Sequence, residues 1–221
     1  MDPAYLEPTA IIDSGHPSIA AFAAEAGGEA RDDRERAVNI YYAVRDRIRY
    51  NPYTMVLTEA HFRASATLAR GEGFCITKAA LYAAALRAAG IPARLGFADV
   101  KNHLATVRLL EMMGSDLFIW HGYVSMFLDG RWVKATPAFN VEMCRRFGVL
   151  PLEFDGTADS LLHPFNARGE RHMEYVRDRG LFDDLPLEQV AADMRASYPK
   201  LIAAVEAKEL SGAFEKDVLV R

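Results

Sequence analysis

The stretch GEGFCITKAALYAAALRAAGIPARLGF, residues 71–97, carries most of the information about this fold. Two glycines break the chain, and Cys75 then opens a segment whose apolar residues recur at helical spacing. Gly90 suits a left-handed helix C-cap and Pro92 prevents continuation, so a helix is predicted from Cys75 to about residue 89. The apolar stripe is mostly alanine, which lets the helix approach a neighbouring sheet closely. Its members are Ile76, Ala79, Ala80, Ala83 and Leu86.

The position of Cys75 at the predicted helix start has chemical consequences. A thiol there lies beside unpaired backbone N–H groups and the positive end of the helix dipole, both of which favour the thiolate. The same N–H groups can hold a developing oxyanion. A small buried residue that merely fills the helix start explains the position equally well. The position alone therefore leaves two interpretations open, a nucleophile and a structural thiol.

A β-hairpin is predicted downstream of this helix. Residues 93–100 alternate as a strand does, and the runs FIWHGYVSMFL (118–128) and RWVKATPAF (131–139) follow. Asp129-Gly130 between these runs is a strong two-residue hairpin signal. His121 lies in the middle of the first hairpin strand, where the sheet would fix its direction. A cysteine paired with a histidine distant in sequence is the general pattern of thiol acyl transfer.

The remaining segments predict further helices and a last pair of strands. Helices are expected from Pro17, over residues 32–50, in part of 58–70, over 104–114, around 142–148 and from about Leu187; strands are expected around 161–166 and 172–176. This order argues for an α+β fold in one domain, 1–221, rather than a doubly wound parallel sheet. No two histidines have the spacing of metal ligands, so no metal site is expected.

Composition limits the classes of function. The 221 residues carry a net charge of −4 and only two cysteines. An acidic chain without a dense basic run gives no support to nucleic-acid binding. No apolar run is long enough for a membrane span, and the N-terminus lacks a basic start followed by an apolar run, the signature of a signal peptide. Free thiols in a cytoplasmic protein are therefore expected.

The segments GEGFCITKAALYAAALRAAGIPARLGF and WHGYVSMFLDGRWVKATPAFN together resemble the transglutaminase-like superfamily of papain-related thiol enzymes, which includes bacterial cysteine proteases. The resemblance extends over residues 50–140. It implies an α+β papain-like core at about 37–140, with the nucleophile helix packed on an antiparallel sheet. An N-terminal helical lead-in and a C-terminal elaboration would flank that core. It also implies Cys75 as nucleophile and His121 as its base.

The third catalytic position departs from the family pattern. Relatives carry an aspartate before a proline, whereas this chain has Thr136 before Pro137. Threonine can accept a hydrogen bond from imidazole but carries no charge. Asn140 is the nearest amide oxygen, and papain-like enzymes accept asparagine in this role. Asp99 and Asp116 are acidic candidates from other segments.

The oxyanion hole also leaves alternatives open. The backbone N–H of Cys75 is expected to be one donor, and the second would come from Asn51, Tyr53 or Trp120.

The sequence thus predicts a thiol-dependent enzyme that hydrolyses or transfers an amide or peptide acyl group through a Cys75 thioester, with no cofactor. Its substrate would be a peptide, a protein or a small amide. Lack of a calcium-type acidic loop favours a hydrolase over a calcium-dependent crosslinker. Acyl transfer to an amine, as in arylamine acetyltransferases, matches the motifs less well. The alternative is a catalytically impaired binding module that has lost the acidic third residue.

Overall fold

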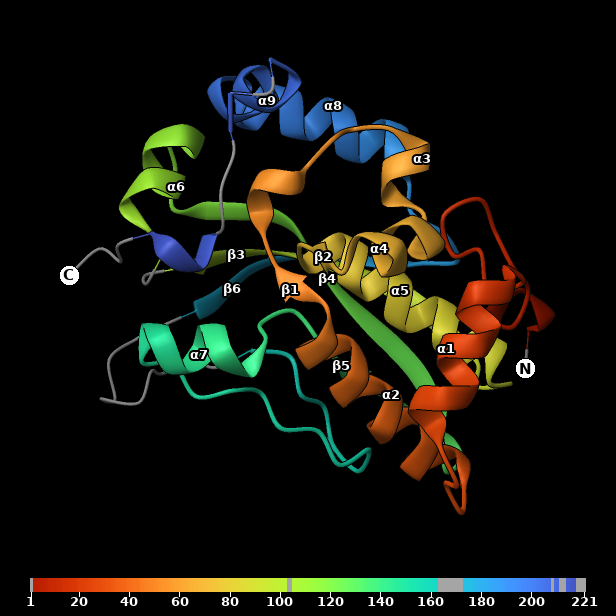
Figure 1. The fold of residues 1–221 in the computed structure, drawn as a ribbon. Coiled ribbons are helices and arrows are strands. Elements are labelled where there is room, and N and C mark those ends of the chain that lie inside the picture. The colour runs from red at the N-terminus through yellow and green to blue at the C-terminus, as the bar shows by residue number, and fades with distance from the viewer. Residues whose placement is uncertain (1, 103–104, 163–172, 208, 211–213, 218–221) are drawn as a thin grey trace.

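The structure of this chain is a computed structural model, which describes residues 2–102, 105–162, 173–207, 209–210 and 214–217. A four-stranded antiparallel sheet forms its centre, with the strand order β5-β4-β3-β6 (Figure 1). The strands are β3 (Ala93–Asn102), β4 (Leu117–Leu128), β5 (Arg131–Ala135) and β6 (Met173–Phe182). The predicted α+β class is confirmed.

Helices surround this sheet. Their bounds in the described chain are α1 (Pro17–Gly27), α2 (Asp33–Arg47), α3 (Glu59–Phe62), α4 (Ala64–Arg70), α5 (Cys75–Ala88), α6 (Val107–Met113), α7 (Val141–Phe147), α8 (Leu187–Ser197) and α9 (Pro199–Glu206). Short 3-10 turns lie at Pro3–Tyr5, Pro52–Thr54 and Phe214–Lys216. Figure 1 shows α8 and α9 at the same end of the molecule as α6, which α9 contacts.

Helix α5 is the centre of the fold. It contacts β3 and β4 on one side and α1, α2 and α4 on the others, so it is buried all round rather than along one stripe. Gly122 of β4 permits this packing, because a Cβ there would lie 3.0 Å from Ile76 Cα and 3.1 Å from the Cys75 carbonyl oxygen. Ala79 Cβ lies next to the same point. The alanine-rich helix therefore meets the sheet nearly backbone to backbone, as predicted.

The hairpin prediction is confirmed, with one adjustment. β4 and β5 pair from Leu128↔Arg131 to Val124↔Ala135 around the turn at Asp129-Gly130. The predicted second strand runs to residue 139, but β5 ends at Ala135. Pro137 lacks the N–H that a continued ladder would need, which accounts for the early end.

The predicted pairing of the last strands, 161–166 with 172–176, falls mostly outside the described residues and stays a prediction. Within the described residues, β6 pairs with β3 from Leu95↔Phe182 to Asn102↔Met173, which the sequence does not predict. Of the segment 161–166, only 161 and 162 lie within the described residues. The apolar residues of β3 are buried on both sides, so a central position between two strands suits it better than an edge.

A short parallel pair near Cys75 is not predicted from the sequence. β1 (Arg49–Tyr50) pairs with β2 (Glu72–Gly73), which brings the end of α2 alongside the start of α5. Two-residue strands carry no periodicity from which they could be recognised. Across the described residues, no helix has the length and apolar character needed to cross a bilayer.

A buried lysine joins α5 to the end of α2. Lys78 is fully buried, and its Nζ donates hydrogen bonds to the carbonyl oxygens of Arg45 (2.9 Å) and Ile48 (2.5 Å). These carbonyls belong to the last turn of α2 and the residue after it, where helical partners are missing. Burial lowers the Lys78 pKa to about 7. Lys78 thus acts as a side-chain cap for α2.

Replacing Lys78 with alanine is expected to lower the free energy of unfolding by about 3 kcal/mol, because it leaves a cavity and two buried carbonyl oxygens without a donor. Urea denaturation followed by circular dichroism measures the change. Lys200→Ala, at an exposed position of α9, is the control and should change stability by less than about 0.5 kcal/mol. Equal stabilities of the two variants would show that Lys78 does not cap α2.

Candidate active site

Cys75 is the first residue of α5, as predicted. The turn before it is closed by Thr77, whose Oγ1 accepts a hydrogen bond from the Phe74 N–H (3.0 Å). Three backbone N–H groups, those of Gly122, Ile76 and Cys75 itself, lie near enough to the Cys75 sulfur to lower its pKa. Two of these N–H groups belong to the helix start and the third comes from strand β4.

An apolar pocket of about 30 Å³ opens beside the Cys75 thiol. Its walls come from the turn after β1, from α6, from the start of β4 and from α8 and α9. The side chain of Cys75 is partly exposed. The lining residues are Tyr50, Pro52, Met55, Phe74, Cys75, Leu109, Met113, Phe118, Ile119, Met194, Tyr198 and Leu201.

The apolar surroundings of Cys75 affect the pKa of its thiol more than its position at the helix start does. Burial raises the pKa of the Cys75 thiol to about 11, although the N–H groups of Gly122 and Ile76 lower it. The dipole of α5 favours the thiolate, but the desolvation of a charged sulfur is the larger effect in this conformation. The thiol is therefore protonated at neutral pH.

His121 lies in β4 and is buried. It lines a small cavity of about 10 Å³ together with Thr136, and neither its Nε2 nor the Thr136 Oγ1 has a hydrogen-bond partner among the described residues. Burial lowers the His121 pKa to about 4, so the imidazole is neutral. The cavity is otherwise lined by Ala138, Phe139, Leu152, Leu161, Leu162 and Met173.

Cys75 and His121 approach β4 from its two faces. Gly122 faces α5, and successive residues of a strand point to opposite faces. His121 pairs with Ala98, which packs with Tyr123 on the face away from α5. No hydrogen bond between the Cys75 sulfur and the His121 ring is present in the described structure. The backbone N–H of Gly122, and not the imidazole of His121, is therefore the group of β4 that lies near the sulfur.

The two candidates for orienting His121 lie in different surroundings. Thr136 follows β5 and shares the cavity of His121, as the hairpin register predicts. Asn140 precedes α7, and its Oδ1 accepts a hydrogen bond from the Tyr50 backbone N–H (3.0 Å). Asn140 therefore positions the chain at Tyr50, one wall of the thiol pocket. Contact of Thr136 or Asn140 with the imidazole stays a prediction.

The predicted side-chain donors for the oxyanion hole are engaged elsewhere in this conformation. The Tyr53 hydroxyl donates to the Asp217 carboxylate, and the Trp120 indole N–H donates to Asp193 (2.9 Å). Asn51 accepts from the Tyr53 N–H and donates to Glu72. Either Tyr53 or Trp120 would have to give up its present partner to bind an oxyanion. The Gly122 N–H, which sequence reasoning misses, already lies near the sulfur.

Two other carboxylates considered as partners of His121 are bound to different groups. Asp99 accepts hydrogen bonds from the Trp120 N–H (3.1 Å) and from Arg179 Nε (2.6 Å). Asp116 lies 4.0 Å from the Lys101 ammonium at the surface. In the described part of the chain, no group of three or more His, Cys, Asp and Glu side chains could hold a metal ion.

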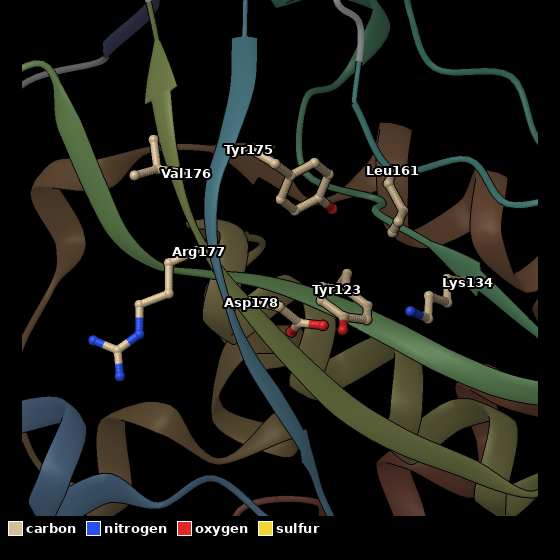
Figure 2. Close-up of a pocket in the computed structure, with 7 residues that line it drawn as sticks. All are labelled: Tyr123, Lys134, Leu161, Tyr175, Val176, Arg177 and Asp178. Atoms are coloured by element: carbon tan, nitrogen blue, oxygen red, sulfur yellow. The ribbon is translucent and has the colours of Figure 1, made fainter.

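The outer face of the sheet carries a second, larger hollow of about 310 Å³. Figure 2 shows Tyr175 and Asp178 of β6 on the same side as Tyr123 and Lys134, whereas Arg177 lies on the other side of the strand. Leu161 lines both this hollow and the His121 cavity. Among the described residues, the face of the sheet that carries His121 therefore borders this hollow.

Sequence reasoning also misses the residues from the C-terminal third that reach the thiol pocket. The Tyr198 hydroxyl donates to the Leu117 carbonyl (2.6 Å) and accepts from the Ile119 N–H (2.7 Å). Met194 of α8 lines the pocket as well. Apolar residues of amphipathic helices look alike whether they cover a core or a thiol, so no local signal distinguishes them.

The raised thiol pKa predicts how alkylation depends on pH. Because the Cys75 pKa lies near 11, the thiolate fraction, and with it the rate of iodoacetamide alkylation, should rise about tenfold per pH unit between pH 7 and 10. A Cys144→Ala protein leaves Cys75 as the single thiol, and mass spectrometry follows its modification. A rate that is already at its plateau at pH 7 would contradict the prediction and indicate a preformed thiolate.

Comparisons with known proteins give a family match and a similar solved structure. The family model of the transglutaminase-like superfamily core matches residues 20–137, more than half of the chain. The fold is also similar to the crystal structure of a candidate cysteine protease from Cytophaga hutchinsonii. That similarity has 17% identity and a TM-score of 0.49, and it covers 81% of this chain and 46% of that one. This chain therefore corresponds to less than half of that protein.

No curated protein sequence matches the chain significantly. The family match includes the helix that Cys75 opens and the strand that carries His121. With the helix-on-sheet packing, it shows that this chain belongs to the transglutaminase-like superfamily.

Proposed function

We propose that this chain is a thiol-dependent acyl-transfer enzyme that hydrolyses or transfers an amide or peptide acyl group, with Cys75 as nucleophile and His121 as base. The observation that best supports this proposal is the position of the Cys75 sulfur at the start of α5, near the N–H groups of Cys75, Ile76 and Gly122. Backbone donors fixed at a helix start and a strand stabilise a developing oxyanion without reorganisation.

The starting protonation states are those of a general-base reaction, but the gap between a Cys75 pKa of about 11 and a His121 pKa of about 4 opposes the proton transfer until the two groups are brought together. Cys75 holds its proton, and neutral His121 can accept it. As the proton moves to the imidazole, the sulfur attacks the carbonyl carbon of the amide. Collapse of the tetrahedral oxyanion breaks the C–N bond, and the imidazolium gives its proton to the leaving amine. A thioester on Cys75 and neutral His121 remain.

The thioester is resolved by water or by an amine. His121 takes a proton from the incoming nucleophile, which attacks the thioester carbon, and the C–S bond breaks. The departing sulfur recovers the proton from the imidazolium. With water the products are a carboxylic acid and the amine released earlier; with a second amine the product is a new amide. In this structure the imidazole and the sulfur lie on opposite faces of β4, so the reaction requires the backbone of β4 around His121 to rearrange and bring the ring to the side of the sulfur.

Acetylation by p-nitrophenyl acetate tests the proposal. The intact protein is expected to release a burst of p-nitrophenolate and to carry an acetyl group on Cys75, detected by mass spectrometry of its peptides. Cys75→Ala and His121→Gln should reduce turnover to the background rate. Cys144→Ala, which removes the other cysteine, should retain it. A burst of p-nitrophenolate that persists in Cys75→Ala would show that Cys75 is not the nucleophile. Adding glycinamide and detecting its acetyl product separates amide formation from hydrolysis.

The rival function is a binding module without catalysis. Thr136 in place of an acidic residue favours this alternative, as does the His121 Nε2, which has no partner among the described residues, because no charged side chain described in this cavity supports an imidazolium. Such a module should bind peptides yet show no acetylation of Cys75 and no difference between wild type and Cys75→Ala. The same experiment therefore separates the two functions.

A further inference from the structure

A β-bulge lies in β4 immediately before His121. Ala98 pairs with His121 and Val100 with Phe118, so one β3 residue, Asp99, faces two β4 residues, Ile119 and Trp120. Trp120 has φ 57°, in the left-handed region that bulky residues rarely adopt, and it is buried. A bulge turns the side chains that follow it, and such a backbone persists only where its surroundings hold it. The direction of His121 therefore depends on what holds Trp120.

Four polar contacts hold Trp120 and its partners. The Asp99 carboxylate accepts from the Trp120 N–H (3.1 Å) and from Arg179 Nε (2.6 Å). The Asp193 carboxylate accepts from the Trp120 indole N–H (2.9 Å) and from Arg179 Nη1 (2.8 Å). The Arg179 guanidinium also lies over the indole ring, 4.4 Å from its centre. Arg179 thus joins two carboxylates that each bind Trp120.

The network draws on three strands and a helix. Arg179 itself is an extra residue in β6, because Gly180 pairs with Phe97 and Asp178 with Ala98. Its side chain is 11% exposed and that of Asp99 is 7% exposed. Water therefore screens these charges little, and the planar guanidinium, which binds both carboxylates, fixes their separation. Arg179 and Asp193 lie beyond residues 20–137, the part that matches the family.

We infer that Arg179, Asp99 and Asp193 are positioning residues that hold the Trp120 bulge and thereby set the direction of His121 for acyl transfer. The inference rests on the proposed role of His121 as base. The C-terminal β6 and α8 then complete the active site of the family core, rather than merely extending the fold. None of the three residues needs to touch the substrate.

Arg179→Gln is the principal variant. It removes the charge between two carboxylates and should leave Trp120 and His121 without one fixed orientation, so that fewer molecules reach the arrangement in which the ring meets the sulfur. With p-nitrophenyl acetate as probe, kcat is expected to fall about 10- to 100-fold while KM changes by less than about twofold. Arg179→Lys, which keeps the charge and part of the hydrogen bonding, should recover part of kcat. Arg195→Gln is the control, because Arg195 of α8 forms an exposed pair with Glu206; its kcat should stay within about twofold.

NMR of the imidazole gives a readout that does not depend on turnover. In protein labelled with ¹⁵N-histidine, the ring signals of His121 are identified by their absence in His121→Gln. They should shift in Arg179→Gln, return toward the wild-type position in Arg179→Lys and remain in place in Arg195→Gln. If Arg179→Gln does not fold, Asp193→Asn serves instead, since it disturbs the partly exposed end of the network.

The outcomes distinguish the inference from the proposed function. If the wild-type protein shows no turnover but the His121 ring signals shift in Arg179→Gln, the proposed function is wrong and the positioning role is supported. Unchanged ring signals in a folded Arg179→Gln or Asp193→Asn protein overturn the positioning role, whatever the turnover. Equal losses of kcat in Arg179→Gln and Arg195→Gln overturn it as well.

Discussion

Gly122→Val is expected to lower the free energy of unfolding by about 3 kcal/mol or more and to abolish any Cys75 chemistry. A Cβ at this position would lie 3.0 Å from Ile76 Cα and 3.1 Å from the Cys75 carbonyl oxygen, and both are backbone atoms. Neither can move unless the start of α5 moves with it. The three N–H groups that lie near the sulfur would then separate.

A graded series gives this prediction its control. Gly122→Ala should lower the free energy of unfolding by less than Gly122→Val, because a single methyl group requires a smaller displacement of α5. Gly15→Val has room, since the nearest atoms to its Cβ are those of Pro8 at 3.8 Å, and it should change stability by less than about 1 kcal/mol. Chemical denaturation measures stability, and iodoacetamide measures the reactivity of Cys75. Wild-type stability in Gly122→Val would contradict the close packing of α5 on β4.

Thr136→Asp is expected to raise the pKa of His121 from about 4 to above about 7 and to increase turnover of p-nitrophenyl acetate about tenfold or more. Thr136 shares a cavity with His121, and in the part of the chain that the structure describes neither the threonine hydroxyl nor the imidazole Nε2 has a hydrogen-bond partner. A carboxylate in this apolar cavity favours imidazolium strongly. The sign follows directly: His121, neutral at pH 7 in the wild type, would carry a proton there.

The stability of Thr136→Asp should depend on pH in a defined direction. Between pH 5 and 7 the new carboxylate and imidazolium stabilise each other, whereas above the raised His121 pKa the carboxylate is buried without a counter-charge. Its free energy of unfolding should therefore fall as pH rises above 7. Thr136→Asn, similar in size but uncharged, is the control and should show neither effect. NMR titration of His121 in both variants decides the matter. Identical titrations would mean that residue 136 does not reach the ring.

Local pattern explains why much of the fold could be predicted. The helix that begins at Cys75 follows from its apolar spacing and from Gly90 and Pro92, and the hairpin follows from Asp129-Gly130. Both signals depend on residues close together in the chain. The resemblance of these segments to a known family also singles out Cys75 and His121 as the candidate nucleophile and base.

Long-range packing explains why the rest could not be predicted. The pairing of β6 with β3 involves residues about 80 positions apart, and the sequence of neither strand indicates which strand it pairs with. The network that joins Arg179 to Asp99 and Asp193 is dispersed in the same way. An arginine or aspartate in such a strand is indistinguishable from a surface residue until the fold places it.

The sequence by itself determined which thiol opens a helix, which histidine lies in the hairpin and that threonine stands where relatives carry an acid. Only the tertiary structure decided the electrostatic balance at these groups. Burial raises the pKa of Cys75 and lowers that of His121, because each loses the water that would solvate its charged form. A helix start acts on a thiol within one turn, but desolvation depends on every segment that covers it. Those segments come from α6, α8 and α9 as well as from the family core.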